Sequence, residues 1–256
     1  MQEIFYKGEY PVVNSLSFNP STKLDVPITS IATIHYSVMI YYAQNFAMLS
    51  IYVAKLLANN FPDQCADHYL EQLNPLTLPA LDLYYKCVAH NNFLAYIPFN
   101  YLDVRVFPLF LYFLSRLARH AACSGRLADR LYYLNRIIHG INIYHTVNLP
   151  AEFFLAYASH CILPNTTYGN RFVLYHGVSI GSADHQLPTF GNNVILMPNS
   201  IVSGSSSIGD NVVVAAGVKV INQSTPDGVI VYQSTDNQGL FFVDHDNQYI
   251  GKFFSD

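Results

Sequence analysis

The sequence predicts an α+β fold in which an N-terminal α-helical domain is followed by a C-terminal left-handed parallel β-helix. Apolar residues recur every six positions in the C-terminal part, and ten of the 13 glycines lie between residues 169 and 251. The N-terminal part instead shows the three-to-four-residue spacing of amphipathic helices. We therefore expect an α-helical domain over 1–150, a left-handed β-helix domain over 151–235, and a C-terminal tail over 236–256.

Two stretches of the N-terminal part have helical periodicity. Residues 107–122 place most of their large apolar side chains on one helical face. Residues 126–140 repeat the pattern and stop at Gly140, a residue typical of helix C-termini. Prolines are expected to break the remaining sequence into short helices. These prolines are Pro62, Pro75, Pro79, Pro98 and Pro108.

One segment has the length of a membrane-spanning helix. Residues 28–54 contain no Asp, Glu, Lys or Arg, and a bilayer span needs roughly 20 apolar residues. Polar side chains such as His35, Gln44 and Asn45 interrupt the segment, and such groups are costly in lipid. We therefore predict a helix that is buried or lies at a subunit interface, without membrane association.

The C-terminal repeat has a period of six with one interruption. Three six-residue units close a triangular coil, and successive coils stack at about 4.8 Å. The pattern predicts coils at 162–179, 180–201 and 202–219, with four extra residues before Phe190. Stacked repeats need neighbours to cover their ends and faces, so we expect a homotrimer. The repeating positions are Ile162, Tyr168, Leu174, Ile180, Phe190, Leu196, Val202, Ile208, Val214 and Val220.

Composition narrows the class of function. Only 12% of the residues are charged, against about 25% in an average soluble domain, which suggests extra burial between subunits. The formal net charge of −4 argues against a nucleic-acid partner. The four cysteines form no Cys-x-x-Cys pair, and the first residues lack a signal-peptide pattern. These features predict reduced thiols and a cytoplasmic protein.

Several segments resemble a known family. They are Leu131 to Asn142 (LYYLNRIIHGIN), Tyr168 to Gly181 (YGNRFVLYHGVSIG), Asn199 to Gly209 (NSIVSGSSSIG) and Ala215 to Val218 (AAGV). Through them the chain resembles the hexapeptide-repeat (left-handed β-helix) acyltransferases, and among these the serine acetyltransferase-like group, over about residues 105–232. The resemblance implies direct acetyl transfer from acetyl-CoA to a hydroxyl. It also implies a trimer, or a dimer of trimers, with active sites between subunits.

Three histidines are candidate catalytic residues. A hydroxyl must lose its proton as it attacks a thioester, and a histidine with an ordinary pKa near 6.5 suits that role. By its place in the first coil, His160 matches the catalytic histidine of the family. His185, in the interruption of the repeat, matches the family's second active-site histidine. His176 is the rival for the base, because it lies near the same corner one coil later.

The neighbours of these histidines depart from the family pattern. The family uses an aspartate and an arginine beside the two histidines to bind the amine and carboxylate of serine. Ser159 and Asp184 stand at these positions here, and Asp184, a candidate substrate-binding residue, would repel a carboxylate. We therefore expect a neutral hydroxyl acceptor, such as a sugar or polysaccharide precursor. Serine O-acetylation in cysteine biosynthesis is the alternative.

Small residues in the later coils are the candidate acetyl-CoA site. Gly204, Ser205, Ala216 and Gly217 match small positions of the family, where a thin backbone lets the pantetheine arm approach. No metal is expected, since the histidine spacing differs from that of the β-helix metalloenzymes. The remaining alternatives are such a metalloenzyme and a non-catalytic scaffold built from hexapeptide repeats.

Overall fold

The computed structural model describes residues 47–255, apart from the short gaps listed at the end of this paragraph. Most of the charge-free segment 28–54 therefore lies outside the described residues. A helix covers residues 47–60, and three further helices follow before the first strand. None of the described helices is long and apolar enough to cross a membrane. The gaps are 63–67, 121–125, 235–238 and 247–248.

The helices following residue 100 form where the periodicity predicts them. They are α3 (Phe107–His120) and α4 (Arg126–His139), and each buries its apolar face in the core of the helical part. Gly140 follows α4 with φ of 69°, and its N–H donates to the Arg136 carbonyl at 3.0 Å. This left-handed residue ends the helix, because glycine adopts the conformation without steric cost.

The prediction that prolines divide the preceding region into short helices is wrong. The helix α2 (Tyr69–Val88) runs through both Pro75 and Pro79. The two prolines lie on the exposed side, while residues such as Leu73 and Ala80 are fully buried opposite them. A proline inside a helix costs about 3 kcal/mol, but each large buried apolar side chain contributes about 1.5–3 kcal/mol. The buried face of α2 therefore offsets its prolines.

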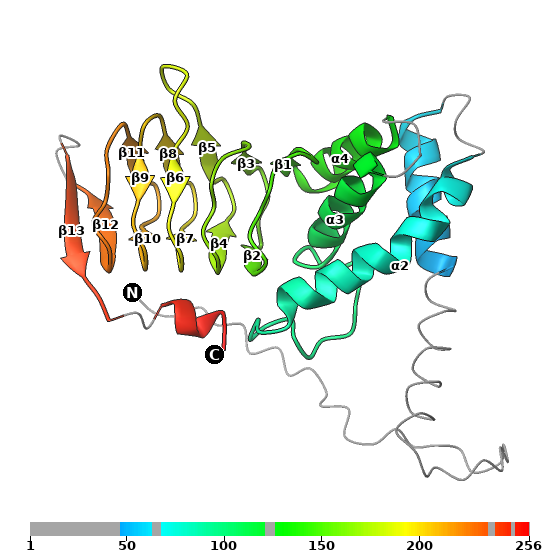
Figure 1. Ribbon diagram of the computed structural model, residues 1–256, viewed down its shortest axis with the longest axis horizontal. Coiled ribbons are helices and arrows are strands. Elements are labelled where there is room, and N and C mark those ends of the chain that lie inside the picture. The colour runs from blue at the N-terminus through cyan, green and yellow to red at the C-terminus, as the bar shows by residue number, and fades with distance from the viewer. Residues whose placement is uncertain (1–46, 63–67, 121–125, 235–238, 247–248, 256) are drawn as a thin grey trace, which may run out of the picture. The chain divides into compact units, whose positions relative to one another are not determined.

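The remainder of the described chain is a parallel β-helix, which confirms the predicted fold class (Figure 1). Its strands form three faces, here called the five-strand, six-strand and two-strand faces. The five-strand face contains β1 (Asn142–Ile143), β3 (Ile162–Leu163), β5 (Ser179–Gly181), β8 (Ile201–Ser203) and β11 (Lys219–Ile221). The six-strand face contains β2 (Phe153–Ala156), β4 (Phe172–Tyr175), β7 (Ile195–Leu196), β10 (Val213–Val214), β12 (Val229–Gln233) and β13 (Leu240–Asp244). The two-strand face contains β6 (Thr189–Phe190) and β9 (Ser207–Ile208).

The repeating apolar residues stack along the core, with one correction. Leu196 lies against Val214 and Phe190 against Ile208, in register, as the period predicts. Ile162, however, is 47% exposed, and it pairs with Ser179. The coil from Ile162 to Ser179 thus has 17 residues, one fewer than three six-residue units, so the buried Leu163 takes the core position that the sequence assigned to Ile162.

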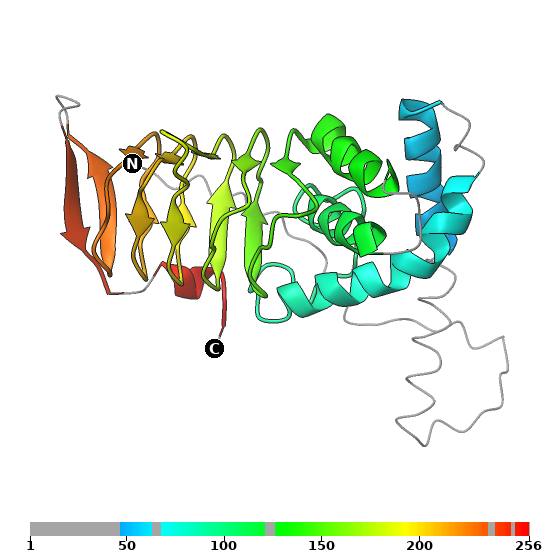
Figure 2. The ribbon, with the colours of Figure 1, turned by 45° about the horizontal axis from the view of Figure 1, so that its top comes forward.

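The β-helix begins and ends differently from the predicted boundaries. Its first strand, β1, pairs with β3 and lies before residue 150. The predicted tail 236–256 is also part of the packed structure, since β13 runs antiparallel to β12. The short helix η2 (Ile250–Lys252) then lies beside the β-helix (Figure 2). Phe254 beyond it is buried and bridges to Asn91 of the helical part.

The helical part and the first coil share one core. The Tyr112 ring of α3 packs edge-on against Phe153 of β2, with ring centroids 5.6 Å apart. Its hydroxyl donates to the Val147 carbonyl at 2.9 Å and accepts from the Leu149 N–H at 3.1 Å. This contact fixes the end of the helices relative to the β-helix, where the candidate site lies.

Candidate active site

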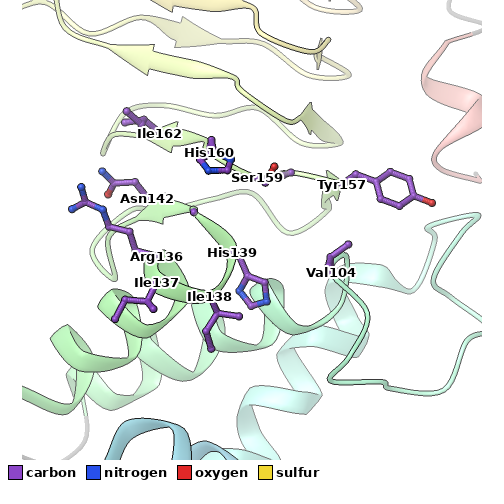
Figure 3. A pocket seen from close by; sticks show the side chains of 12 residues that line it. Val104, Arg136, Ile137, Ile138, His139, Asn142, Tyr157, Ser159, His160 and Ile162 are labelled. Atoms are coloured by element: carbon purple, nitrogen blue, oxygen red, sulfur yellow. The ribbon is translucent and has the colours of Figure 1, made fainter. Parts of the chain in front are cut away.

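A pocket of about 680 Å³ opens between the end of α4 and the first coils. His160 lies on one side of it and His139 on the opposite side, with Arg136 and Asn142 at one end and Tyr157 at the other (Figure 3). The other lining residues are Val104, Ile137, Ile138, Gly140, Ala158, Ser159 and Ile162. Of the three histidines predicted from the sequence, this pocket contains His160.

His160 occupies a strained corner of the β-helix. The corner between the six-strand and five-strand faces, here called the first corner, repeats the same hydrogen bond in successive coils. In each of these coils, the N–H of the corner residue donates to a backbone carbonyl of the preceding coil. The acceptor is the residue directly before the corner residue of that coil. The donors are Gly177, Asn199 and Gly217. Gly177 pairs in this way with Ser159, so its equivalent is His160. All four residues have φ between 55° and 73°, a conformation that suits glycine and asparagine and costs about 1–2 kcal/mol for most other residues.

His176 lies at the same corner but at a different position. It directly precedes Gly177 and is therefore equivalent to Ser159. Its carbonyl accepts the Asn199 N–H at 2.9 Å, and its side chain is exposed. His176 is not among the residues that line the pocket. The two histidines thus lie on adjacent layers, as the sequence spacing predicts, but His160 alone of the two reaches the pocket.

Gly140 lets the His160 ring lie close to the end of α4. A Cβ at residue 140 would lie 3.0 Å from the backbone nitrogen of His160 and 3.3 Å from the Cδ2 atom of the His160 ring. A side chain there would therefore push His160 away, in addition to the cost of its left-handed conformation. The residue predicted as a helix cap also shapes the pocket.

His139 is a pocket residue that sequence reasoning missed. Its Nδ1 lies 2.8 Å from Asn135 Oδ1, and the Asn135 amide nitrogen donates to the Pro108 carbonyl at 3.0 Å. Because this second bond orients the amide, Nδ1 is assigned as the donor and Nε2 as the acceptor of a neutral ring. Burial lowers the pKa of His139 to about 4. The only signal in the sequence was its place directly before Gly140.

The lowered pKa of His139 predicts an acid-sensitive fold. The neutral ring contributes stability above pH 6.5, the ordinary value, and that contribution declines as the pH falls toward 4. Between about pH 7 and pH 5 the free energy of unfolding should therefore fall by about 2 kcal/mol from this group. Urea unfolding at both pH values, with His139→Gln as the comparison, measures it. An equal loss in the variant would contradict the assignment.

His185 lies at the tip of a tight turn in the interruption of the repeat. Ala183 and Gln186 exchange two backbone hydrogen bonds, at 3.1 and 2.9 Å. Between them, Asp184 and His185 have φ of 50° and 63°, as in the turns that favour two-residue hairpins. Both side chains are exposed, and the loop after β5 projects from the β-helix (Figure 1).

The four predicted acetyl-CoA residues fall at two places. Gly204 and Ser205 lie at the corner between the five-strand and two-strand faces, here called the second corner, next to the His185 loop. Ala216 and Gly217 lie at the first corner and are exposed. A Cβ at residue 204 would collide with the Asn222 side-chain amide of the next coil. Gly204 thus has a packing role within the β-helix, whatever it binds.

The predicted site residues therefore line two edges of the five-strand face. His160, His176, Ala216 and Gly217 follow the first corner, whereas Asp184, His185, Gly204 and Ser205 follow the second. The strands that separate these edges are parallel and belong to one sheet. In a single chain, His160 and His185 consequently belong to separate surfaces. Among the described residues, no group of three or more His, Cys, Asp or Glu side chains could hold a metal ion.

Comparison with known proteins finds a matching repeat family and several related serine acetyltransferases. Residues 188–222 match the family of the bacterial transferase hexapeptide, described as six repeats. The serine acetyltransferase of Synechococcus elongatus is 28% identical over 106 residues, which cover 40% of this chain and 43% of that protein. The chain spans about half the length of the curated relatives it matches.

Solved structures show the same fold over a longer range. A serine acetyltransferase from Brucella abortus strain S19 superposes with a TM-score of 0.60 at 18% identity, covering 83% of this chain and 92% of the other. The structure of a serine acetyltransferase in complex with coenzyme A, from the same strain, gives 0.58 at 17% identity, covering 83% and 90%. The predicted resemblance to the serine acetyltransferase-like group of hexapeptide-repeat proteins is confirmed.

Proposed function

We propose that this chain is an acetyl-CoA-dependent O-acetyltransferase with His160 as the general base. The observation that carries the proposal is the position of His160. The later coils place glycine or asparagine at its corner, whereas this coil accepts the strain of a histidine and turns it toward a pocket. Strained residues of this kind concentrate at functional sites. His176, which lies outside that pocket, is the weaker candidate.

The proposed reaction needs one proton transfer and no covalent enzyme intermediate. The His160 imidazole takes the proton of the acceptor hydroxyl as its oxygen attacks the thioester carbonyl carbon. The resulting tetrahedral intermediate carries a negative oxygen, which hydrogen-bond donors stabilise. Its carbon–sulfur bond then breaks, and the CoA sulfur takes the proton back from His160. The products are the acetyl ester and free CoA.

The acceptor we propose is L-serine. The sequence alone favoured a sugar, because Asp184 replaces the expected arginine. The curated relatives are named serine acetyltransferases, however, and these comparisons support the alternative of serine better than the sugar. Asp184 is exposed at a loop tip and is not among the residues that line the His160 pocket. Within one chain, the Asp184 carboxylate therefore lies outside the pocket that we propose for serine.

Acetyl-CoA is proposed to bind along the first corner, beyond His160. A structural relative was solved with coenzyme A, and Ala216 is an exposed small residue of this corner. Ala216→Leu should raise KM for acetyl-CoA about tenfold with little change in unfolding, since its side chain points to solvent. Steady-state kinetics at saturating acceptor measures the change. Gly204→Leu is a poor test, because it would disrupt coil packing first. An unchanged KM in Ala216→Leu would remove this corner from the cofactor site.

A complete site is proposed to need two copies of the chain. His160 and His185 lie on opposite edges of one face, so a homotrimer could place the first edge of one copy beside the second edge of the next. This predicts complementation. The test mixes inactive His160→Ala with inactive His185→Ala under conditions in which subunits exchange. In a random equal mixture, about a quarter of the interfaces combine an intact His160 with an intact His185, so about a quarter or less of the activity should return. If the mixture stays inactive although subunits exchange, each copy contains its own site.

An acceptor panel tests the function itself. Purified protein with acetyl-CoA should release CoA with L-serine and acetylate its hydroxyl, and should do so more slowly with neutral sugars. Release with a sugar but not with serine would restore the sugar acceptor. A complete lack of release with every acceptor, in protein that is folded and oligomeric, would favour the alternative of a non-catalytic scaffold.

The cysteines are consistent with a cytoplasmic location, which we also propose. Cys87 and Cys161 are buried free thiols, and burial raises the pKa of Cys161 to about 11. Such thiols are chemically inert and do not need an oxidising compartment. Cys65 and Cys123 lie outside the described residues.

A further inference from the structure

The charge of the His160 pocket indicates what kind of acceptor it takes. Arg136 is the only lysine or arginine among the lining residues, and none of them is Asp or Glu. Within the part of the chain that the structure describes, the Arg136 guanidinium makes no hydrogen bond or ion pair. It lies at the same end of the pocket as Asn142, while His160 occupies the side above (Figure 3). Arg136 is exposed, and within one chain the pocket lining has this cation and no carboxylate, which favours an anionic ligand.

Two other polar residues of the pocket, Asn142 and His139, are held by hydrogen bonds to neighbouring side chains. The Asn142 side-chain oxygen accepts a hydrogen bond from the Tyr132 hydroxyl at 2.7 Å, which holds its amide in place beside Arg136. The His139 ring donates to Asn135 and is neutral, so it adds no second positive charge. Among the lining residues, the Arg136 guanidinium is therefore the one permanent positive charge that can neutralise an anion on the ligand.

We propose that Arg136 binds a carboxylate on the acceptor and thereby selects hydroxy acids, with serine among them. The inference rests on the proposed function. Asp184 stands in the His185 loop where an arginine was expected. Arg136, in the last turn of α4, would supply the missing cation. An acceptor that reaches both His160 and Arg136 must present a hydroxyl at one end and an anion at the other. A guanidinium forms two parallel hydrogen bonds with a carboxylate, which the single point charge of lysine cannot reproduce.

The test compares binding and kinetics for paired ligands that differ in the carboxylate. L-serine has the carboxylate, whereas L-serinamide replaces it with a neutral amide. Arg136→Gln should weaken calorimetric binding of L-serine, and raise its KM, by about 10- to 100-fold, the effect of losing a charge-assisted pair. The same variant should leave serinamide and acetyl-CoA unchanged. Arg136→Lys should fall between, and Arg119→Gln is the matched control, an exposed arginine of the last turn of α3 outside the pocket.

Each outcome separates the inference from the proposed function. Binding of L-serine that depends on Arg136 supports the inference, whether or not acetyl transfer follows. A lack of transfer in that case would count against the proposed function alone. Equal losses for serine and serinamide would show a merely structural role. A raised KM for acetyl-CoA in place of serine would assign the cation to a phosphate of that ligand. Wild-type protein that binds serinamide as tightly as serine, or transfers to serine without needing Arg136, would overturn the inference while the function stands.

Discussion

Replacement of His160 by alanine should lower kcat by roughly 10²–10⁴, the usual contribution of a general base. The imidazole is proposed to take the hydroxyl proton at the pocket, and no other described histidine combines access to that pocket with an exposed ring. A better matched variant is His160→Asn. Asparagine occupies the same left-handed corner two coils later, at Asn199, so it should keep the backbone and remove only the base. Initial rates of CoA release at saturating substrates measure the loss.

The rival base is tested by the same measurement. His176→Ala should retain nearly full activity, since its side chain does not line the pocket. His185→Ala should impair transfer through the acceptor or charge stabilisation, without changing acetyl-CoA binding. If His176→Ala abolishes turnover while His160→Asn is nearly wild type, the roles of these two histidines must be exchanged. Unfolding midpoints of all three variants, close to that of the wild type, would show that the losses are catalytic.

Gly191→Ala should destabilise the β-helix by about 3 kcal/mol, at the upper end of the cost of overpacking a well-filled core. A Cβ at this residue would lie 2.8 Å from the carbonyl carbon and oxygen of Gly209 in the next coil. Those atoms belong to the backbone of a parallel stack with fixed spacing, so they cannot rotate away. The urea midpoint of unfolding should fall accordingly.

Gly181→Ala is the matched control for this stability prediction. Gly181 ends a coil strand, whereas Gly191 directly follows one. Nothing lies within 4 Å of the Cβ that would be added at Gly181, and its φ is not left-handed. It should be neutral, or stabilising by up to about 1 kcal/mol, because alanine has fewer unfolded conformations. If both variants lose stability equally, glycine content and not close coil packing explains the sensitivity.

The repeat made the β-helix predictable, because each coil repeats the same local requirement. A period of six with small residues at the corners identifies strands and turns without any long-range information. The shortened coil that begins at Ile162 was not predictable in this way, since Ile162 and Leu163 are both apolar and only the pairing with Ser179 decides between them. Pro75 and Pro79 misled for a related reason: their cost is local, whereas the burial that offsets it depends on tertiary packing.

The candidate site was only partly visible in the sequence. His160 could be proposed from its place at the start of the first coil. His139, Arg136 and Asn142 could not, because the pocket forms where the end of α4 and the start of β1 lie beside residues 157–162, which come later in the chain. Their roles come from spatial closeness and from charge. The division of the other predicted residues between two corners likewise needed the strand registers.

The most direct test of the account is the stoichiometry of acetyl transfer. The protein should convert acetyl-CoA and L-serine to CoA and O-acetylserine in a one-to-one ratio, followed by thiol release and by mass spectrometry in the same reaction. His160→Asn, folded and oligomeric, should reduce both products in parallel by roughly 10² or more. Release of CoA without an acetylated acceptor, or full activity in His160→Asn, would contradict the account.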